Sequence, residues 1–284
     1  MRFKPTLEVL ATEDLIRIHE ASLKVLEETG MVFHSAEAIE ICQKHGAKIE
    51  GKTVYFSPKM VETALATCPE KFVWQGRNQT KTVTVGDGCL VQPNAGPVYV
   101  HDLENGRRLA TLEDYRNIQK ICQAGDVVQL VGSTPVDPCD VEPNQKHLHI
   151  MYEILKHTDK PLIGYTARKH QVAQMMEMLA IVLGDDNWQE NHWIGVAVNP
   201  LSPLAFTPDA LETIIEYAKR NQIIFIPPAI MAGVCGPMGL LGTIVLQNSE
   251  ILGGLVLTQL INPGTPVVYT AAGTVSYMKR ANYN

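Results

Sequence analysis

The pattern of hydrophobic and polar positions changes near residue 111 of this 284-residue chain. From there on, amphipathic segments typical of helices alternate with short, nearly continuous apolar runs typical of strands covered on both faces. Because parallel neighbouring strands need a crossover connection, this alternation predicts parallel β/α units. The predicted helices are 112–124, 143–157, 168–183, 208–220 and 243–260, and the predicted strands are 127–132, 161–166, 193–198, 223–228 and 266–271.

An earlier strand of the same sheet is predicted at 89–93, which makes six in all. Six strands leave two architectures open. A doubly wound α/β sheet can be complete with six strands, whereas a TIM (β/α)8 barrel requires eight. The sequence stops soon after the last predicted strand and supplies no helix to cover it, so we expect a piece of a longer protein.

The first 110 residues mix short helical and strand-like segments without that regular alternation. Thr12 can cap a helix that ends at Gly30, and Ser57 followed by Pro58 can start another. We therefore expect two regions, an N-terminal α+β cap over 1–88 and a β/α region over 89–284.

Charge and composition exclude several classes of protein. The net charge is −6 and no dense Lys/Arg cluster is present, so nucleic-acid binding is not expected. The longest unbroken apolar run of the neutral C-terminal stretch is 251–257, far shorter than the roughly 20 residues of a membrane span. The N-terminus lacks the apolar segment of a secretory signal, which favours a cytoplasmic protein.

Two further patterns argue against common sites. The six cysteines stand singly without a C-x-x-C pair, so we expect buried reduced thiols and neither a disulfide framework nor a metal site. Residues 46–53, GAKIEGKT, match a phosphate-loop pattern. A phosphate loop leaves a strand and opens a helix, whereas here a helical segment precedes and a β-branched segment follows. We therefore interpret Gly46 as a helix C-cap and Glu50-Gly51 as a turn between short strands.

Glu250 is the only charged residue between Arg220 and Lys279. A lone carboxylate in apolar surroundings costs several kcal/mol unless it is paired or hydrogen-bonded. Its partner is either the protein, through backbone amides or side chains such as Asn248 and Thr270, or a cationic ligand. The residue pattern leaves both alternatives open.

Polar and aromatic residues recur where the predicted strands end. Tyr165 lies at the end of the strand 161–166, Asn199 and Ser202 follow the strand 193–198, and Tyr269 lies near the end of the last one. In parallel β/α architectures, sites assemble at the C-terminal ends of the strands. Together with Phe206, these residues are candidates for a site at that edge.

Three segments resemble the trimethylamine methyltransferase family: GTIVLQNSEILGGLVLTQLINPGTPVVY (242–269), NPLSPL (199–204) and IHEASLKVLEETGM (18–31). The resemblance implies a TIM barrel with an N-terminal elaboration, here truncated after about six strands. It also implies transfer of a methyl group from a methylated amine to the Co(I) of a separate corrinoid protein, with no metal or cofactor held tightly by this chain.

The family has two branches. Members that act on trimethylamine contain pyrrolysine near the seventh strand, a position that this sequence does not reach. The larger branch lacks pyrrolysine and acts on quaternary amines such as glycine betaine, and we favour it because it is the more abundant. The remaining alternatives are a pyrrolysine member, a doubly wound α/β enzyme or binder, and a betaine-binding module.

A site for a quaternary amine needs groups that hold a cation. We hypothesise that Tyr165, Phe206, Tyr269 and Glu250 surround the cation, because aromatic faces and carboxylates attract it. Asn199 and Ser202 are suitable donors for a carboxylate on the substrate. The expected partners are therefore a small methylated amine and a corrinoid protein, and self-association into a homo-oligomer stays open.

Overall fold

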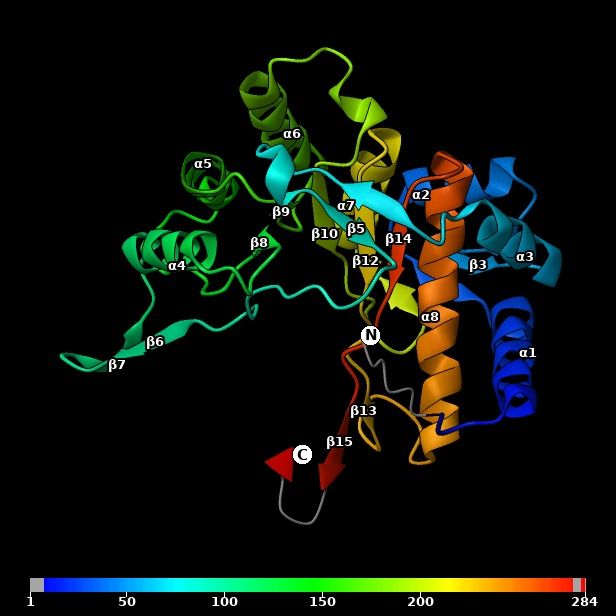
Figure 1. The fold of residues 1–284 in the computed structure, drawn as a ribbon. Coiled ribbons are helices and arrows are strands. Elements are labelled where there is room, and N and C mark those ends of the chain that lie inside the picture. Colours follow the sequence, from blue (N-terminus) through cyan, green and yellow to red (C-terminus); the bar gives the residue numbers. More distant parts are fainter. Residues whose placement is uncertain (1–7, 278–281, 284) are drawn as a thin grey trace, which may run out of the picture.

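The computed structural model describes residues 8–277 and 282–283. Its central sheet has five parallel strands in the order β14-β12-β10-β9-β8, so that each strand lies beside the next one along the chain (Figure 1). A doubly wound sheet reverses its strand order at a switch point, and the described strands do not. The bounds are β8 Val131–Gly132, β9 Leu162–Ile163, β10 Ile194–Ala197, β12 Ile223–Ile226 and β14 Val267–Tyr269.

A helix connects each of these strands to the next, as the alternating pattern predicts. Helix α4 covers the predicted residues 112–124, and the other four helices agree with prediction to within three residues at either end. The strands are shorter than the apolar runs, because several apolar residues of those runs lie outside the ladder. The bounds are α4 Leu112–Ala124, α5 Lys146–His157, α6 Lys169–Leu183, α7 Pro208–Lys219 and α8 Leu240–Ile261.

The strand predicted at 89–93 is wrong, because this segment forms no ladder. The carbonyl of Val91 accepts hydrogen bonds from the amides of Gln129 and Leu130, and the Val91 amide donates to the side chain of Gln129. The segment therefore lies beside the residues that lead into β8 but is held there partly through a side chain.

Alternate residues of the sheet pack into two separate apolar clusters. Leu162, Ile194 and Ile224 face outward and belong to the large cluster with the helices. Leu130 and Ile163 face inward, in a smaller cluster closed by the hairpin of β4 (Phe72–Trp74) and β5 (Val83–Val85). The hairpin lies at the N-terminal ends of the strands, since the amide of Gln75 donates to the carbonyl of His192, just before β10.

The N-terminal segments pack against α8 and α7 (Figure 1). Strand β1 pairs antiparallel with β3 and parallel with β11, a short strand from the loop that follows β10. The N-terminal region thus reaches one of the loops at the strand ends, and the division at residue 88 stays a prediction. The elements are α1 Thr12–Glu28, β1 Met31–Phe33, α2 Ala36–Lys44, β2 Lys48–Glu50, β3 Thr53–Tyr55, α3 Pro58–Thr67 and β11 Ala205–Phe206.

Most local signals in this region are confirmed. Gly30 ends α1 with a φ of 73°, and the Ser57 hydroxyl caps α3 by accepting from the Met60 amide. Thr12 is the first residue of α1 and does not cap it, because Ala11 occupies the capping position. Residues 46–53 run from the end of α2 through β2 and the turn at Gly51 and Lys52 into β3, so they open no helix and the phosphate-loop interpretation is excluded.

Helix α8 is long and apolar enough to cross a membrane by length and composition alone. The run-length argument from the sequence missed this, because polar residues interrupt the apolar stretch. All residues from 248 to 259 are buried, and the helix packs against α1, α3 and α7. In this structure α8 is therefore a helix of the protein core.

All six cysteines are free. Cys89 and Cys139 are exposed, so the expectation of buried thiols is wrong for these two.

The remaining described elements are peripheral to the sheet. The other elements are η1 Gln79–Lys81, β6 Tyr99–Asp102, β7 Gly106–Leu109, η2 Trp188–Glu190, β13 Met231–Ala232, β15 Thr274–Tyr277 and β16 Asn282–Tyr283.

Candidate functional site

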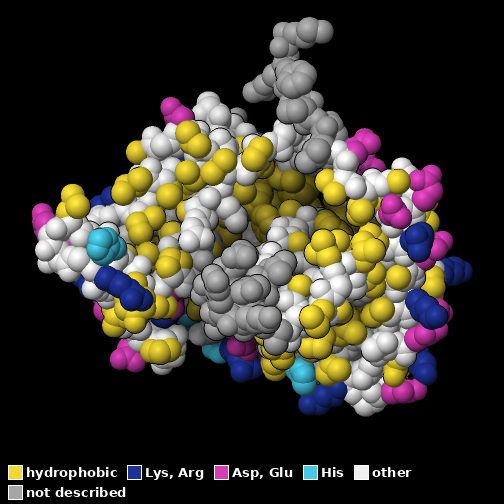
Figure 2. All heavy atoms as spheres, turned by 90° about the horizontal axis from the view of Figure 1, so that it is seen from below, with side chains coloured by type: hydrophobic (Ala, Val, Ile, Leu, Met, Phe, Trp, Pro, Cys, Tyr) yellow, Lys and Arg dark blue, Asp and Glu magenta, His cyan; other side chains and the backbone are white. Residues whose placement is uncertain are grey.

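The inner face of the sheet is open at the C-terminal ends of the strands. Figure 2 looks at this end and shows a hollow surrounded by hydrophobic side chains. Ala197, at the end of β10, is exposed, although Val196 and Val198 on either side of it are buried. Open space therefore begins on the inner face above the cluster that the β4–β5 hairpin closes. We call this space the mouth.

Asn199 lies at the mouth. Gly195 and Ala197 of β10 face the inner side of the sheet, and Asn199 is the next alternate residue along the chain, so it is expected to face the same side. Its side chain is exposed. Its amide carries two N–H donors and one carbonyl acceptor, so it can contact either a carboxylate or a hydroxyl of a ligand. The strand-end argument from the sequence is consistent with this position.

Tyr165 follows β9 and is half-buried, packed against the outer apolar cluster. Burial raises the pKa of its phenol, the negative charge of Asp137 raises it further, and Lys146 opposes the shift. The neighbouring hydroxyl of Thr166 donates to the carbonyl of Ala197, at 2.7 Å. This bond ties the end of β9 to the end of β10, next to Asn199.

Glu250 is completely buried in α8. Its Oε1 accepts from the Leu204 amide and its Oε2 from the Ser202 hydroxyl, each at 2.8 Å. Burial raises the pKa of this carboxyl, and the two hydrogen bonds oppose that shift. The protein therefore supplies its partners, which are neither Asn248 nor Thr270. A direct contact between Glu250 and a cationic ligand finds no support in this placement.

Ser202 and Phe206 are also engaged within the protein. The Ser202 hydroxyl donates to Glu250, and Phe206 is fully buried on β11. The Phe206 ring meets Phe33 edge-on, with centroids 5.9 Å apart and planes at 82°. Neither residue presents a free face to the mouth, because the loop after β10 turns back to pair with β1.

Tyr269 lies on the outer side of β14. Its inner-facing neighbour Val268 packs with the inner cluster, whereas the Tyr269 hydroxyl donates to Asn248 Oδ1 on α8, at 2.9 Å. Of the six candidates, the structure brings Glu250 and Ser202 together, leaves Asn199 exposed at the mouth and half-buries Tyr165 at the end of β9. It does not assemble the four-membered cation group.

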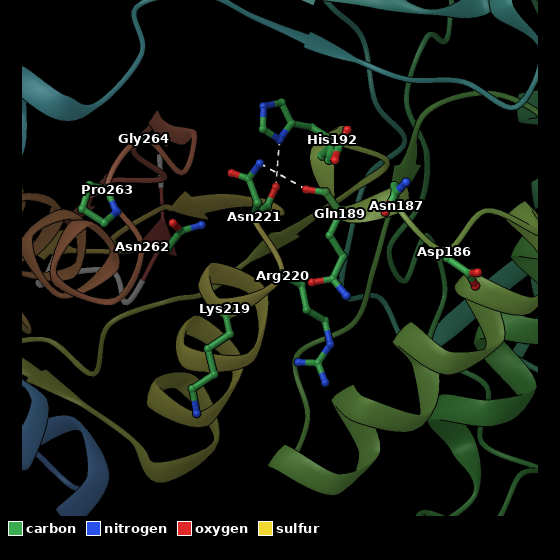
Figure 3. A pocket seen from close by; sticks show the side chains of 11 residues that line it. Asp186, Asn187, Gln189, His192, Lys219, Arg220, Asn221, Asn262, Pro263 and Gly264 are labelled. Carbon is green, nitrogen blue, oxygen red and sulfur yellow. Dashed lines mark hydrogen bonds between the residues drawn. The ribbon is translucent and has the colours of Figure 1, made fainter.

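A polar cleft of about 700 Å³ lies at the opposite end of the sheet (Figure 3). His192 and Asn221 lie two residues before β10 and β12, and Figure 3 shows the hydrogen bonds that join His192 to Asn221 and Asn221 to Gln189. Burial lowers the pKa of His192. This end of a parallel β/α architecture usually serves stability rather than chemistry.

The two basic side chains of this cleft are paired with carboxylates outside its lining. Lys219 pairs with Glu37 at 2.8 Å, and Arg220 pairs with Glu216 at 2.5 Å. The first pair connects the end of α7 to α2, and the second connects Arg220 back to α7. The cleft is therefore a weaker candidate than the mouth. Within the described residues, no group of three or more His, Cys, Asp or Glu is arranged to hold a metal ion.

The band of polar residues in α8 was only partly recognised from the sequence. Besides Glu250, Asn248 and Ser249 are buried and hydrogen-bonded to Ser22 of α1. The detectable signal was the run QNSE inside an otherwise apolar helix. Its partners lie far away in sequence, so the run alone could not identify them.

The family model described as trimethylamine methyltransferase matches residues 1–281. A glycine betaine methyltransferase of Desulfitobacterium hafniense is 35% identical over 277 residues, covering 97% of this chain and 58% of the relative. A proline betaine:corrinoid methyltransferase of Eubacterium limosum is 30% identical, covering 95% of this chain and 57% of the relative. The chain thus spans little more than half the length of these relatives.

Solved structures show the same fold at low sequence identity. The hydroxylamine complex of MtmB superposes with a TM-score of 0.57 at 12% identity, covering 93% of this chain and 55% of the other. The monomethylamine methyltransferase MtmB of Methanosarcina barkeri gives a TM-score of 0.50 at 11% identity, with 92% and 59% covered. At such identities the likeness concerns the fold alone.

Proposed function

Because the chain belongs to the trimethylamine methyltransferase family, we propose that it forms part of an enzyme that transfers a methyl group from a methylated amine to the Co(I) centre of a separate corrinoid protein. The observation that carries the proposal is the family match over residues 1–281. We propose a quaternary amine such as glycine betaine as the substrate, because relatives with 30% and 35% identity are named as betaine methyltransferases.

We also propose that the five strands belong to a TIM barrel. Their parallel pairing and sequential order support a barrel, as do the connecting helices packed on the outer face. The inner cluster with its hairpin would then close the N-terminal end of the barrel, and the mouth would be its C-terminal end. Residues 1–88 would form the N-terminal elaboration.

A quaternary ammonium group loses a methyl group and departs as a neutral amine, so the protein need not supply a proton. The partner corrinoid would supply the Co(I) nucleophile, and the hydrophobic rim of the mouth suits a partner surface that excludes water (Figure 2). The work of this chain is then to orient the substrate. A cytoplasmic location and the absence of a tightly held cofactor stay predictions.

We propose two residues for that orientation. Asn199 is exposed at the mouth and would donate an amide N–H to the carboxylate of a betaine. Tyr165, half-buried at the end of the neighbouring strand β9, would offer an aromatic face to the cation. Glu250, Ser202 and Phe206 would act only indirectly, because other parts of the protein occupy them. Tyr269 is 59% exposed, but it lies on the outer side of β14 and its hydroxyl is bonded to Asn248.

The proposed reaction can be tested with the full-length protein and a reduced corrinoid protein from the same organism. Loss of the Co(I) absorbance should follow the addition of glycine betaine or another quaternary amine. Trimethylamine and dimethylamine belong in the same panel. If no methylated amine in that panel methylates the corrinoid, the proposal is wrong.

Replacing Asn199 by Ala tests the orienting role. The variant should lose about 10- to 100-fold in kcat/KM for glycine betaine, since a hydrogen bond to a charged group contributes roughly 1.5 to 3 kcal/mol. Tetramethylammonium has no carboxylate and is the matched control, for which kcat/KM should change much less. An equal loss for both compounds would rule out a contact between Asn199 and the carboxylate.

A further inference from the structure

Four consecutive polar residues interrupt the apolar helix α8: Gln247, Asn248, Ser249 and Glu250, which we call the polar band. The last three of them are buried. Buried polar groups destabilise a protein unless they are hydrogen-bonded, so their partners indicate what the band holds in place.

The polar band connects three segments that lie far apart in sequence. Asn248 donates to the Ser22 hydroxyl of α1 at 2.9 Å and accepts from the Tyr269 hydroxyl at the end of β14. Ser249 donates to the Ser22 carbonyl at 3.4 Å. Glu250 alone reaches the loop 199–206, which leads from β10 at the mouth to β11.

The loop 199–206 contains a strained turn at the point that Glu250 contacts. Leu204 has a φ of 53°, a left-handed conformation that costs a residue with a Cβ about 1 to 2 kcal/mol. The Leu204 amide donates to Glu250, and its carbonyl accepts from Val32 at 2.8 Å. Removing Glu250 would leave the amide of this strained residue without a partner, so the turn would relax.

We propose that Glu250 is a positioning residue that holds the loop 199–206, and with it Asn199, in place at the mouth through its two hydrogen bonds. It acts by geometry and does not serve as the counter-charge of a bound cation. The link to substrate rests on the function proposed above, whereas the link to the loop stands on the hydrogen bonds themselves.

The substitution Glu250→Gln distinguishes the effect of the two hydrogen bonds from the effect of the negative charge. Its carbonyl oxygen can accept from the Leu204 amide, and its NH2 group can donate to the Ser202 hydroxyl, which also accepts. Glu250→Gln therefore keeps both hydrogen bonds and removes the charge. Glu250→Ala removes both.

The experiment follows amide hydrogen exchange in the peptide 199–206 of the full-length protein, together with calorimetric binding of glycine betaine. In Glu250→Ala the exchange of this peptide should rise about tenfold or more, because an unpartnered buried group costs roughly 1 to 3 kcal/mol. Glu250→Gln should stay within about threefold of wild type, in exchange and in Kd, since a tenfold change needs about 1.4 kcal/mol.

Two further variants keep the test decisive. Ser249→Ala is the matched control, because it removes a buried hydrogen bond of the same helix that does not reach the loop, and it should leave the exchange of 199–206 unchanged. Ser202→Ala removes one of the two donors, and it should raise that exchange even if Glu250→Ala does not fold.

The outcomes separate the two proposals. If Glu250→Ala and Ser202→Ala exchange like wild type, or if Glu250→Gln exchanges as fast as Glu250→Ala, Glu250 does not position the loop. If the exchange results are as expected but Glu250→Gln abolishes glycine betaine binding, the charge matters, and the statement that Glu250 acts by geometry and not as a counter-charge is overturned. If wild type binds no methylated amine, only the proposed function fails, because hydrogen exchange needs no ligand.

Discussion

Gly195 lies in the middle of β10, with its missing side chain on the inner face of the sheet. A Cβ there would lie 2.6 Å from the ring of Trp74 and 2.8 Å from Phe225. Trp74 is fully buried, and its indole N–H donates to the Trp193 carbonyl, so the ring has little freedom to move. The absence of a side chain at this position is what lets the β4–β5 hairpin sit against the sheet.

Gly195→Ala should therefore destabilise the protein by about 1 to 3 kcal/mol through overpacking. Urea unfolding followed by circular dichroism measures this change. Gly125→Ala is the control, because a Cβ at position 125 makes only an ordinary contact, 3.6 Å from the Ile121 carbonyl. Equal stability changes in the two variants would contradict the close packing at Gly195.

The β4–β5 hairpin is fastened to the sheet by a carboxylate that precedes β9. Asp159 accepts from Lys81 at 2.7 Å, from Gln123 at 2.6 Å and from Asn78 at 3.3 Å. Burial pushes the pKa of Asp159 upward, but these hydrogen bonds outweigh burial and hold the pKa at about 2, below the ordinary value of 3.8. The folded state therefore favours the ionised carboxylate.

The sign of this shift predicts a pH dependence. Because the folded pKa is depressed, the stability that Asp159 contributes is present above pH 3.8 and is lost as the pH falls toward 2. The side chain is 37% exposed, so we expect only about 1 kcal/mol in Asp159→Asn at pH 7. The unfolding free energies of wild type and Asp159→Asn should approach each other as the pH is lowered from 7 to 3. A difference that stays constant over this range would contradict the lowered pKa of Asp159.

The molecule as a whole is organised by the two faces of its sheet. The helices cover the outer face, and the β4–β5 hairpin covers the N-terminal part of the inner face and leaves the mouth open. Trp74 is the largest side chain of the inner cluster and is fully buried. The inner cluster should therefore depend on this one residue.

Trp74→Ala should lower the free energy of unfolding by about 3 to 5 kcal/mol, the usual range for a large aromatic side chain removed from a core. Val73→Ala is the matched control, since Val73 is the next residue of the same strand and is 44% exposed. It should change stability far less. Denaturant unfolding measures both, and a small loss in Trp74→Ala would mean that the hairpin is not part of the cooperative core.

The helices and the parallel connections could be predicted from the sequence, because local periodicity and capping residues carry that information. Helix α4 was predicted residue for residue, and the need of Glu250 for a partner followed from the cost of burying a charge. The segment 89–93 was misread, because an apolar run resembles a strand whether or not a neighbour pairs with it.

The candidate site depended on contacts that no local pattern contains. Glu250 reaches partners 46 and 48 residues away, Tyr269 turns outward to α8, and Phe206 enters the core through pairing of β11 with β1. Periodicity and burial preference act over a few residues, so they specify which segments form and that a buried carboxylate needs partners. Which partners it finds, and which strand-end side chains remain free for a ligand, depends on how distant segments pack in three dimensions.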